Sequence, residues 1–210
     1  ITCGTGVVVP LDKSLTENEL LSLIERSEIE AIFYTSKYTE IMERAKKENI
    51  GKIKFFISMD LEEKTGEIYS QKELIKVGKD LIKNGARSFL DAEIDNDAMT
   101  VMLFTSGTTS QSKAVMLSHT NLATNIYDIG SIFDIRKGDV LLSFLPLHHV
   151  FECTVGFLFV LSVGGTIAFC EGIRHIAENL KEFECTAMIA VPVLFVNLYQ
   201  KVWQGIDKKG

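Results

Sequence analysis

The sequence lacks an excess of positive charge. Its 22 lysine and arginine residues stand against 28 aspartate and glutamate residues, which gives a formal net charge of −6 at pH 7. A protein that binds nucleic acid without sequence preference needs basic side chains to neutralise the phosphate groups. We therefore expect no nucleic-acid partner for this chain.

Closely spaced cysteines are also missing. The four cysteines are Cys3, Cys153, Cys170 and Cys185, and no pair has the short spacing of a zinc knuckle or a redox motif. They are typical of reduced, buried cysteines in a cytosolic protein, so the predicted localisation is cytoplasmic. No basic signal-peptide start is visible, and the opening at residues 1–3, without Met, suggests a piece of a longer chain.

No apolar run has the length of a transmembrane helix. The longest run, residues 154–163, is followed by Gly164-Gly165 and stops short of the about 18 unbroken apolar residues that indicate a spanning helix. We predict a buried helix, a glycine turn and a buried strand instead, and expect no transmembrane segment.

Short apolar runs and amphipathic stretches alternate along the chain. This order indicates parallel sheets with helices on their faces, so the predicted fold class is α/β with parallel-rich sheets flanked by helices. The acidic connector Asp91–Asp97 separates a first α/β lobe at residues 1–95 from a second one at residues 96–210. Thr16-Glu-Asn-Glu19 fits a capping box at the start of the first helix. The predicted strands are 6–9, 31–34, 54–57, 99–104, 139–143, 166–169 and 186–190; the predicted helices are 20–27, 38–49, 73–83, 121–132, 154–163, 173–183 and 193–203; and residues 61–70 are a predicted loop.

One polar loop follows the predicted strand at 99–104. It reads Thr105-Ser-Gly-Thr-Thr-Ser-Gln-Ser-Lys113, with six hydroxyl side chains, one glycine and one lysine. Hydroxyls, backbone N–H groups and a lysine offer donors and positive charge to phosphate oxygens. The spacing excludes a Walker loop, because Lys113 follows Ser112 rather than a glycine. The alternative is a solvated turn whose hydroxyls cap its own backbone.

Two adjacent histidines, His148 and His149, follow the predicted strand at 139–143. Side chains at neighbouring positions diverge in regular structure, so we do not expect them to chelate a metal together. The residue types alone leave two alternatives open. One is an acid–base or binding role, and the other is a half-buried histidine whose ring nitrogen is satisfied at a strand end.

Both polar segments resemble one family. Thr105–Val115 is similar to the TSGTTGxPKGV signature of acyl-adenylate-forming enzymes and departs from it at Ser110, Ser112 and Ala114. Leu145–Glu152 is similar to the LPLxHxFE stretch of long-chain fatty acyl-CoA synthetases. The chain is identified as a member of this AMP-binding superfamily, and the resemblance implies part of the large N-terminal domain of an acyl-CoA synthetase-like fold.

The resemblance implies an AMP-forming long-chain-fatty-acid–CoA ligase. Its substrates and cofactors would be a fatty acid, ATP, Mg²⁺ and coenzyme A. His149 would be the catalytic residue that orients the acyl carboxylate, and His149 and Phe151 would line the acyl pocket. Thr108 would face the magnesium ion. The residues that would bind the ATP phosphates are Thr105, Ser106, Gly107, Thr108, Thr109, Ser110 and Lys113.

Later motifs of the family are not found in this chain: an aromatic-Gly-x-Thr-Glu segment, a ribose-binding aspartate and a C-terminal lysine. The resemblance therefore implies that C-terminal parts of the enzyme are absent. The 210-residue chain alone is expected to be inactive, and to self-associate through faces that the rest would cover. Two alternatives stay open. One is a non-catalytic nucleotide-binding or scaffold α/β module, and the other is an acyl-AMP ligase with a different acceptor.

Overall fold

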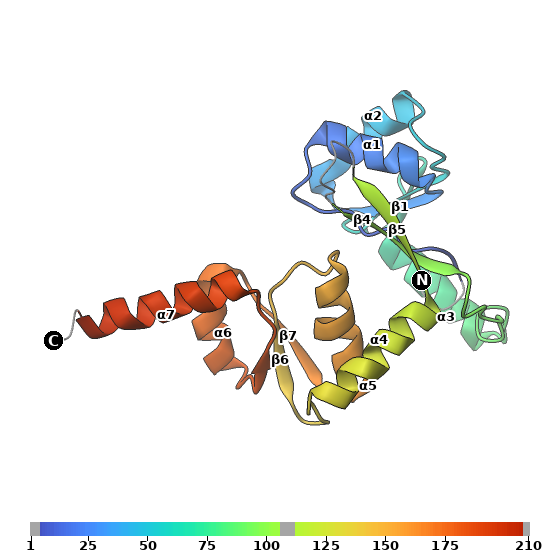
Figure 1. Ribbon diagram of the computed structural model, residues 1–210. Helices are drawn as coiled ribbons and strands as arrows, with labels where there is room; N and C mark the ends of the chain where they lie inside the picture. The colour runs from blue at the N-terminus through green and yellow to red at the C-terminus, as the bar shows by residue number, and fades with distance from the viewer. Residues whose placement is uncertain (1–4, 106–111, 208–210) are drawn as a thin grey trace. The chain divides into compact units, whose positions relative to one another are not determined.

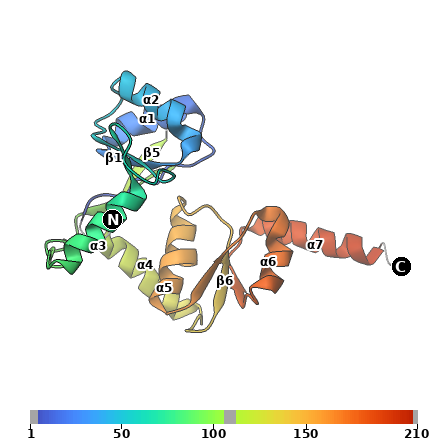
Figure 2. The same cartoon turned by 180° about the vertical axis from the view of Figure 1, so that it is seen from behind.

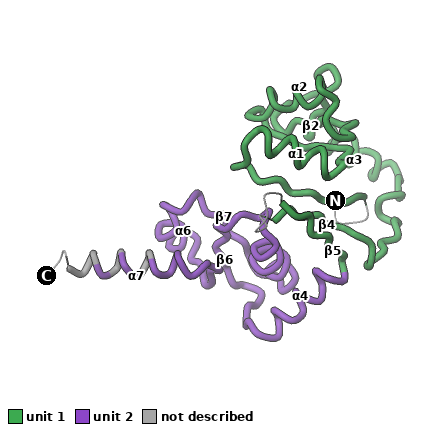
Figure 3. Tube along the Cα trace, turned by 45° about the horizontal axis from the view of Figure 1, so that its top comes forward, with its two compact units in different colours: residues 1–119 green, residues 120–210 purple. Residues whose placement is uncertain are grey.

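The computed structural model describes residues 5–105 and 112–207 (Figure 1). The chain divides into two compact units, residues 1–119 and 120–210, and each is described by itself (Figure 3). Residues 96–119 thus group with the first unit, whereas the predicted second lobe begins at residue 96. The lobe boundary stays a prediction.

Unit 1 contains a parallel sheet of three short strands. In spatial order they are β1 (Ala31–Tyr34), β2 (Phe55–Ser58) and β3 (Ile68–Ser70). Ala31 pairs with Phe55, and Phe56 pairs with Ile68. The predicted loop at 61–70 is wrong at its end, where residues 68–70 form β3. A strand of three residues is too short to show an alternating pattern in the sequence.

Two helices cover one face of this sheet, α1 (Glu17–Ser27) and α2 (Thr39–Lys47), with the short helix η1 (Ser36–Tyr38) before α2. The predicted capping box is confirmed: both the backbone N–H and the hydroxyl of Thr16 donate to the Glu19 carboxylate, at 2.9 and 2.7 Å. The helices and strands share one apolar core, made of Leu20, Leu21, Ile24, Ile32, Tyr34, Met42, Ala45 and Phe56.

Helix α3 (Gln71–Lys83) follows β3 in unit 1. Ser70 caps its start, since the Ser70 hydroxyl accepts a hydrogen bond of 3.2 Å from the Glu73 N–H. None of its residues is buried. Its exposed apolar side chains are Leu74, Ile75, Val77, Leu81 and Ile82.

Ile24 offers a test of the unit 1 core. Its side chain is fully buried, so Ile24→Ala removes apolar contacts and leaves a cavity. We expect the free energy of unfolding of the chain, measured with urea, to fall by about 3 kcal/mol. The matched control is Ile82→Ala at a side chain that is 46% exposed; its expected loss is below about 1 kcal/mol. Equal losses would contradict the assignment of Ile24 to the core.

A β-hairpin completes unit 1. β4 (Met99–Thr105) and β5 (Lys113–Ser118) run antiparallel. On the other side of β4, Val8 forms a parallel bridge with Val101 through two backbone hydrogen bonds of 2.9 Å. β5 is not among the predicted strands, and the predicted strand at 6–9 is reduced to a single bridge. The antiparallel direction follows from the length of the connection, because residues 106–112 are too few for the long crossover that a parallel partner needs.

Unit 2 is a parallel sheet with helices on both faces. Its strands, in spatial order, are β7 (Thr166–Phe169), β6 (Val140–Ser143) and β8 (Ala187–Met188); its helices are α4 (His119–Ile132), η2 (Glu152–Phe159), α5 (Val160–Ser162), η3 (Ile173–His175), α6 (Ile176–Glu182) and α7 (Pro192–Asp207). Leu141 and Leu142 point to opposite faces of β6, and both are buried. In Figures 1 and 2 the sheet lies between α5 and α6.

The apolar run forms the predicted helix, turn and strand. The helix differs in type, because residues 152–159 have the π pattern of i→i+5 hydrogen bonds and only α5 is α-helical. Gly164 then turns the chain with φ 74°, and β7 follows. Within residues 5–105 and 112–207, no helix is both long and apolar enough to cross a membrane.

Candidate functional site

The ends of the polar loop are held together by the hairpin. Thr105 is the last residue of β4 and Lys113 the first of β5, and they pair directly across the two strands. Both residues are exposed. The predicted contacts of Ser106, Gly107, Thr108, Thr109 and Ser110 lie outside the described residues and stay predictions.

Arg26, in the last turn of α1, contacts Ser112 of this loop and Phe104 of the strand before it. Its Nη2 donates a hydrogen bond of 2.5 Å to the Ser112 carbonyl, and its guanidinium lies 5.4 Å from the centroid of the Phe104 ring. It brings a guanidinium group to the backbone of the residue before Lys113. Sequence reasoning missed Arg26, because 86 residues separate it from Ser112 and its only local signal is a basic residue at a helix C-terminus.

The histidine segment leaves the carboxyl end of β6, the middle strand of unit 2. His149 is exposed; its N–H donates to the Pro146 carbonyl and its own carbonyl accepts from the Cys153 N–H, both at 3.0 Å. The ring centroids of His148 and His149 are 4.4 Å apart. The expected divergence of the two rings is wrong, because they lie in a turn rather than in regular structure. No group of three metal-ligating His, Cys, Asp or Glu side chains occurs in the described parts of the chain.

Apolar side chains surround His149 in the sequence. Phe151 is 51% exposed, and Leu147 and Val150 are also exposed. Phe151 is therefore available to line an apolar binding surface. It lies in the helical turn just before η2, where it is held by the backbone of the helix.

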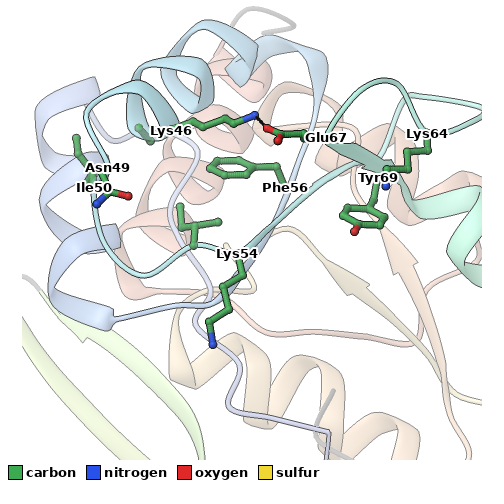
Figure 4. Close-up of a pocket in the computed structure, with 10 residues that line it drawn as sticks. Lys46, Asn49, Ile50, Lys54, Phe56, Lys64, Glu67 and Tyr69 are labelled. Atoms are coloured by element: carbon green, nitrogen blue, oxygen red, sulfur yellow. Dashed lines mark hydrogen bonds and ion pairs between the residues drawn. The ribbon is translucent and has the colours of Figure 1, made fainter.

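A cavity of about 290 Å³ in unit 1 contains none of the predicted site residues (Figure 4). Three lysines line it together with Phe56 and Tyr69. Each lysine already has a partner: Lys46 is paired with Glu67, Lys54 with Glu30, and Lys64 lies over the Tyr69 ring. We assign no ligand to this cavity.

Comparisons with known proteins agree with the two motifs. A family model described as AMP-binding enzyme matches residues 5–208. Long-chain-fatty-acid–CoA ligase 5 of Mus musculus is 32% identical over 213 residues, which cover 93% of this chain and 30% of the mouse protein. The chloroplastic long-chain-fatty-acid–[acyl-carrier-protein] ligase AEE15 of Arabidopsis thaliana is 30% identical over 146 residues, which cover 67% of this chain and 20% of that protein. The chain thus spans less than a third of the length of either relative.

Solved structures share the fold. The inhibitor-bound N-terminal domain of FACL13 from Mycobacterium tuberculosis gives a TM-score of 0.72 at 21% identity, and the match covers 92% of this chain and 46% of that one. ATP-bound MatB from Rhodopseudomonas palustris gives 0.70 at 23% identity, covering 93% and 36%. The predicted α/β fold class, as part of such an N-terminal domain, is confirmed.

Proposed function

The chain belongs to the family of AMP-binding enzymes, and we propose that the full-length protein activates a long-chain fatty acid as acyl-AMP and transfers the acyl group to coenzyme A. One observation carries the proposal. Two family segments, Thr105–Lys113 and Leu145–Glu152, each begin at or just after the end of a strand, in a chain 32% identical over most of its length to a long-chain-fatty-acid–CoA ligase.

The first segment would bind the ATP phosphates. A fatty-acid carboxylate attacks the α-phosphorus, and pyrophosphate leaves; catalysis of such a step is mostly positioning and neutralisation of charge. Lys113 supplies a cation and Thr105 a hydroxyl at the two ends of the loop. Thr108 would face the Mg²⁺ ion, which would neutralise phosphate charge when bound.

The second segment would bind the acyl group. His149, exposed beyond the end of β6, would orient the carboxylate for attack, and Phe151 would pack against the alkyl chain. The thiol of coenzyme A then attacks the acyl carbonyl carbon, the thioester forms and AMP leaves with its phosphate oxygen. An acyl-carrier thiol is the second candidate acceptor, since the Arabidopsis relative is named for it.

The test is ATP–pyrophosphate exchange by the full-length protein with short-, medium- and long-chain fatty acids. Exchange that depends on a long-chain acid is the expected result. Pyrophosphate is incorporated into ATP only when the adenylation step runs in reverse, and that step requires the acid. Adding coenzyme A or a carrier protein then identifies the acceptor by the thioester that forms. Absence of exchange with every acid would support the non-catalytic scaffold, which the departures at Ser110, Ser112 and Ala114 favour.

For the 210-residue chain by itself, inactivity and self-association through exposed apolar side chains such as those of α3 remain proposals. Cytoplasmic localisation is likewise proposed, on the basis of the unpaired cysteines. Cys153, Cys170 and Cys185 form no disulfide and are partly buried, and Cys3 lies outside the described residues.

A further inference from the structure

A buried carboxyl group joins the two ends of the histidine segment. Glu152, the first residue of η2, is 1% exposed, and Ser143, the last residue of β6, is 4% exposed. The Ser143 hydroxyl donates a hydrogen bond of 2.6 Å to Glu152 Oε1. This bond ties the end of the central strand to the start of the helix.

Gly156 makes room for this carboxyl group. A Cβ built on Gly156 would lie 2.6 Å from both the carboxyl carbon and Oε1 of Glu152, closer than any real Cβ contact. The atoms involved belong to a side chain that is already held by Ser143, so it has little freedom to move away. The Glu152 carboxyl group therefore occupies the space that a side chain at residue 156 would need.

The carboxyl group has no charged partner. Within the described residues, Glu152 Oε2 has no hydrogen-bond partner, and no ion pair includes Glu152. Burial raises the pKa of Glu152, and the hydrogen bond from Ser143 only partly offsets this. A neutral carboxyl is the form that such a site favours, because an unpaired buried charge is costly.

The segment between the two anchors carries His149 and Phe151. It is short and bonded to itself, through His149 N–H to the Pro146 carbonyl and Cys153 N–H to the His149 carbonyl. Fixing residues 143 and 152 therefore limits where the exposed His149 and Phe151 side chains can be placed.

We propose that Glu152 is a positioning residue of the acyl site: its buried carboxyl group accepts a hydrogen bond from Ser143, packs against Gly156 and so fixes the segment that carries His149 and Phe151. The inference rests on the proposed function, since it is that function which gives the segment a substrate. Glu152 touches no reacting atom in this role. Its size and hydrogen bonding matter, and its charge does not.

The first experiment compares Glu152→Gln with Glu152→Ala in the full-length protein. Gln keeps the shape and can still accept from Ser143, so exchange activity within about threefold of the wild type is expected. Ala removes the anchor, and we expect KM for the fatty acid to rise about tenfold to a hundredfold while KM for ATP stays within about twofold. Equal losses in Gln and Ala would overturn the proposal, because the proton or charge would then be essential.

Hydrogen exchange gives a readout independent of catalysis. Amides of residues 144–153 should exchange faster in Glu152→Ala than in the wild type and Glu152→Gln, with unit 1 amides unchanged. A uniform increase over the whole chain, or none at 144–153, would overturn the proposal. If the wild type shows no pyrophosphate exchange with any acid, the proposed function fails, and this measurement still decides whether Glu152 anchors the segment.

A double-mutant cycle with Gly156→Ala tests the contact between the Glu152 carboxyl group and Gly156. Gly156→Ala should displace the carboxyl and raise KM for the fatty acid as Glu152→Ala does, by about tenfold or more. In the Glu152→Ala background the same change should have little further effect, because no carboxyl remains to be displaced. Additive effects would contradict a direct fit between the two residues.

Discussion

Lys113→Ala in the full-length protein is expected to lower fatty-acid-dependent ATP–pyrophosphate exchange about a hundredfold. The lysine begins β5 directly opposite Thr105, so the hairpin fixes its backbone at the mouth of the polar loop. Charge on the β- and γ-phosphates must be held while the α-phosphorus reacts, and removal of a preorganised donor at such a place has effects of this size. The measurement is the initial rate of exchange at saturating fatty acid.

The control variants separate charge from geometry. Lys113→Arg keeps the cation and should retain more activity than alanine, although the flat guanidinium differs from an ammonium group. Lys83→Ala, in the last turn of α3, removes a lysine outside the loop and should leave the rate unchanged. Full exchange activity of Lys113→Ala would contradict the proposal that this loop binds the ATP phosphates.

His149→Ala is expected to lower exchange about tenfold to a hundredfold, mainly through the fatty acid. The residue lies in a turn beyond the end of β6, with its side chain exposed and its backbone fixed by two hydrogen bonds. Loss of the imidazole frees the carboxylate to adopt unproductive orientations, so KM for the acid should rise and kcat should fall. Exchange kinetics at varied fatty acid and fixed ATP measure both.

His175→Ala is the matched control for the imidazole. His175 ends η3, and its Nδ1 lies 3.2 Å from the Glu178 carboxylate of α6. His175→Ala therefore removes an imidazole that is not part of the histidine segment. Its replacement should leave both constants within about twofold, as for a surface substitution. If the two histidine variants behave alike, His149 has no special place in the reaction.

The alternation of elements was sufficient to predict the parallel pairs. β1–β2 and β6–β7 pair as expected from strand–helix–strand order. The hairpin of β4 and β5 was missed, because its long polar connection carries none of the Asn-Gly or Asp-Gly signals of a tight turn. The π-helix was missed as well, since residues 154–163 are apolar almost throughout and give no periodicity from which to infer a helix type.

Site residues were proposed only where they are contiguous in the sequence. Thr105 and Lys113 were proposed because they belong to one loop, and His149 and Phe151 because they belong to another; their roles stay predictions. Arg26 lies 86 residues from Ser112 in the sequence, and this contact is not visible in one sequence. The bond between Ser143 and Glu152 spans nine residues, but it depends on burial that one sequence does not reveal. Glu152 belonged to a recognised motif, yet its role depends on burial and on the missing Cβ at Gly156.

The strand order of unit 2 sets a delay during biosynthesis. The three strands of the first sheet all lie within residues 31–70, whereas β6 at 140–143 must wait for β8 at 187–188 to close its second edge. A ribosome adds about 5–20 residues per second, so that edge of β6 stays unpaired for on the order of seconds after β7 has been made. An open strand edge is a template for wrong pairing. The nascent chain therefore keeps one edge of β6 open to wrong pairing until β8 has been made.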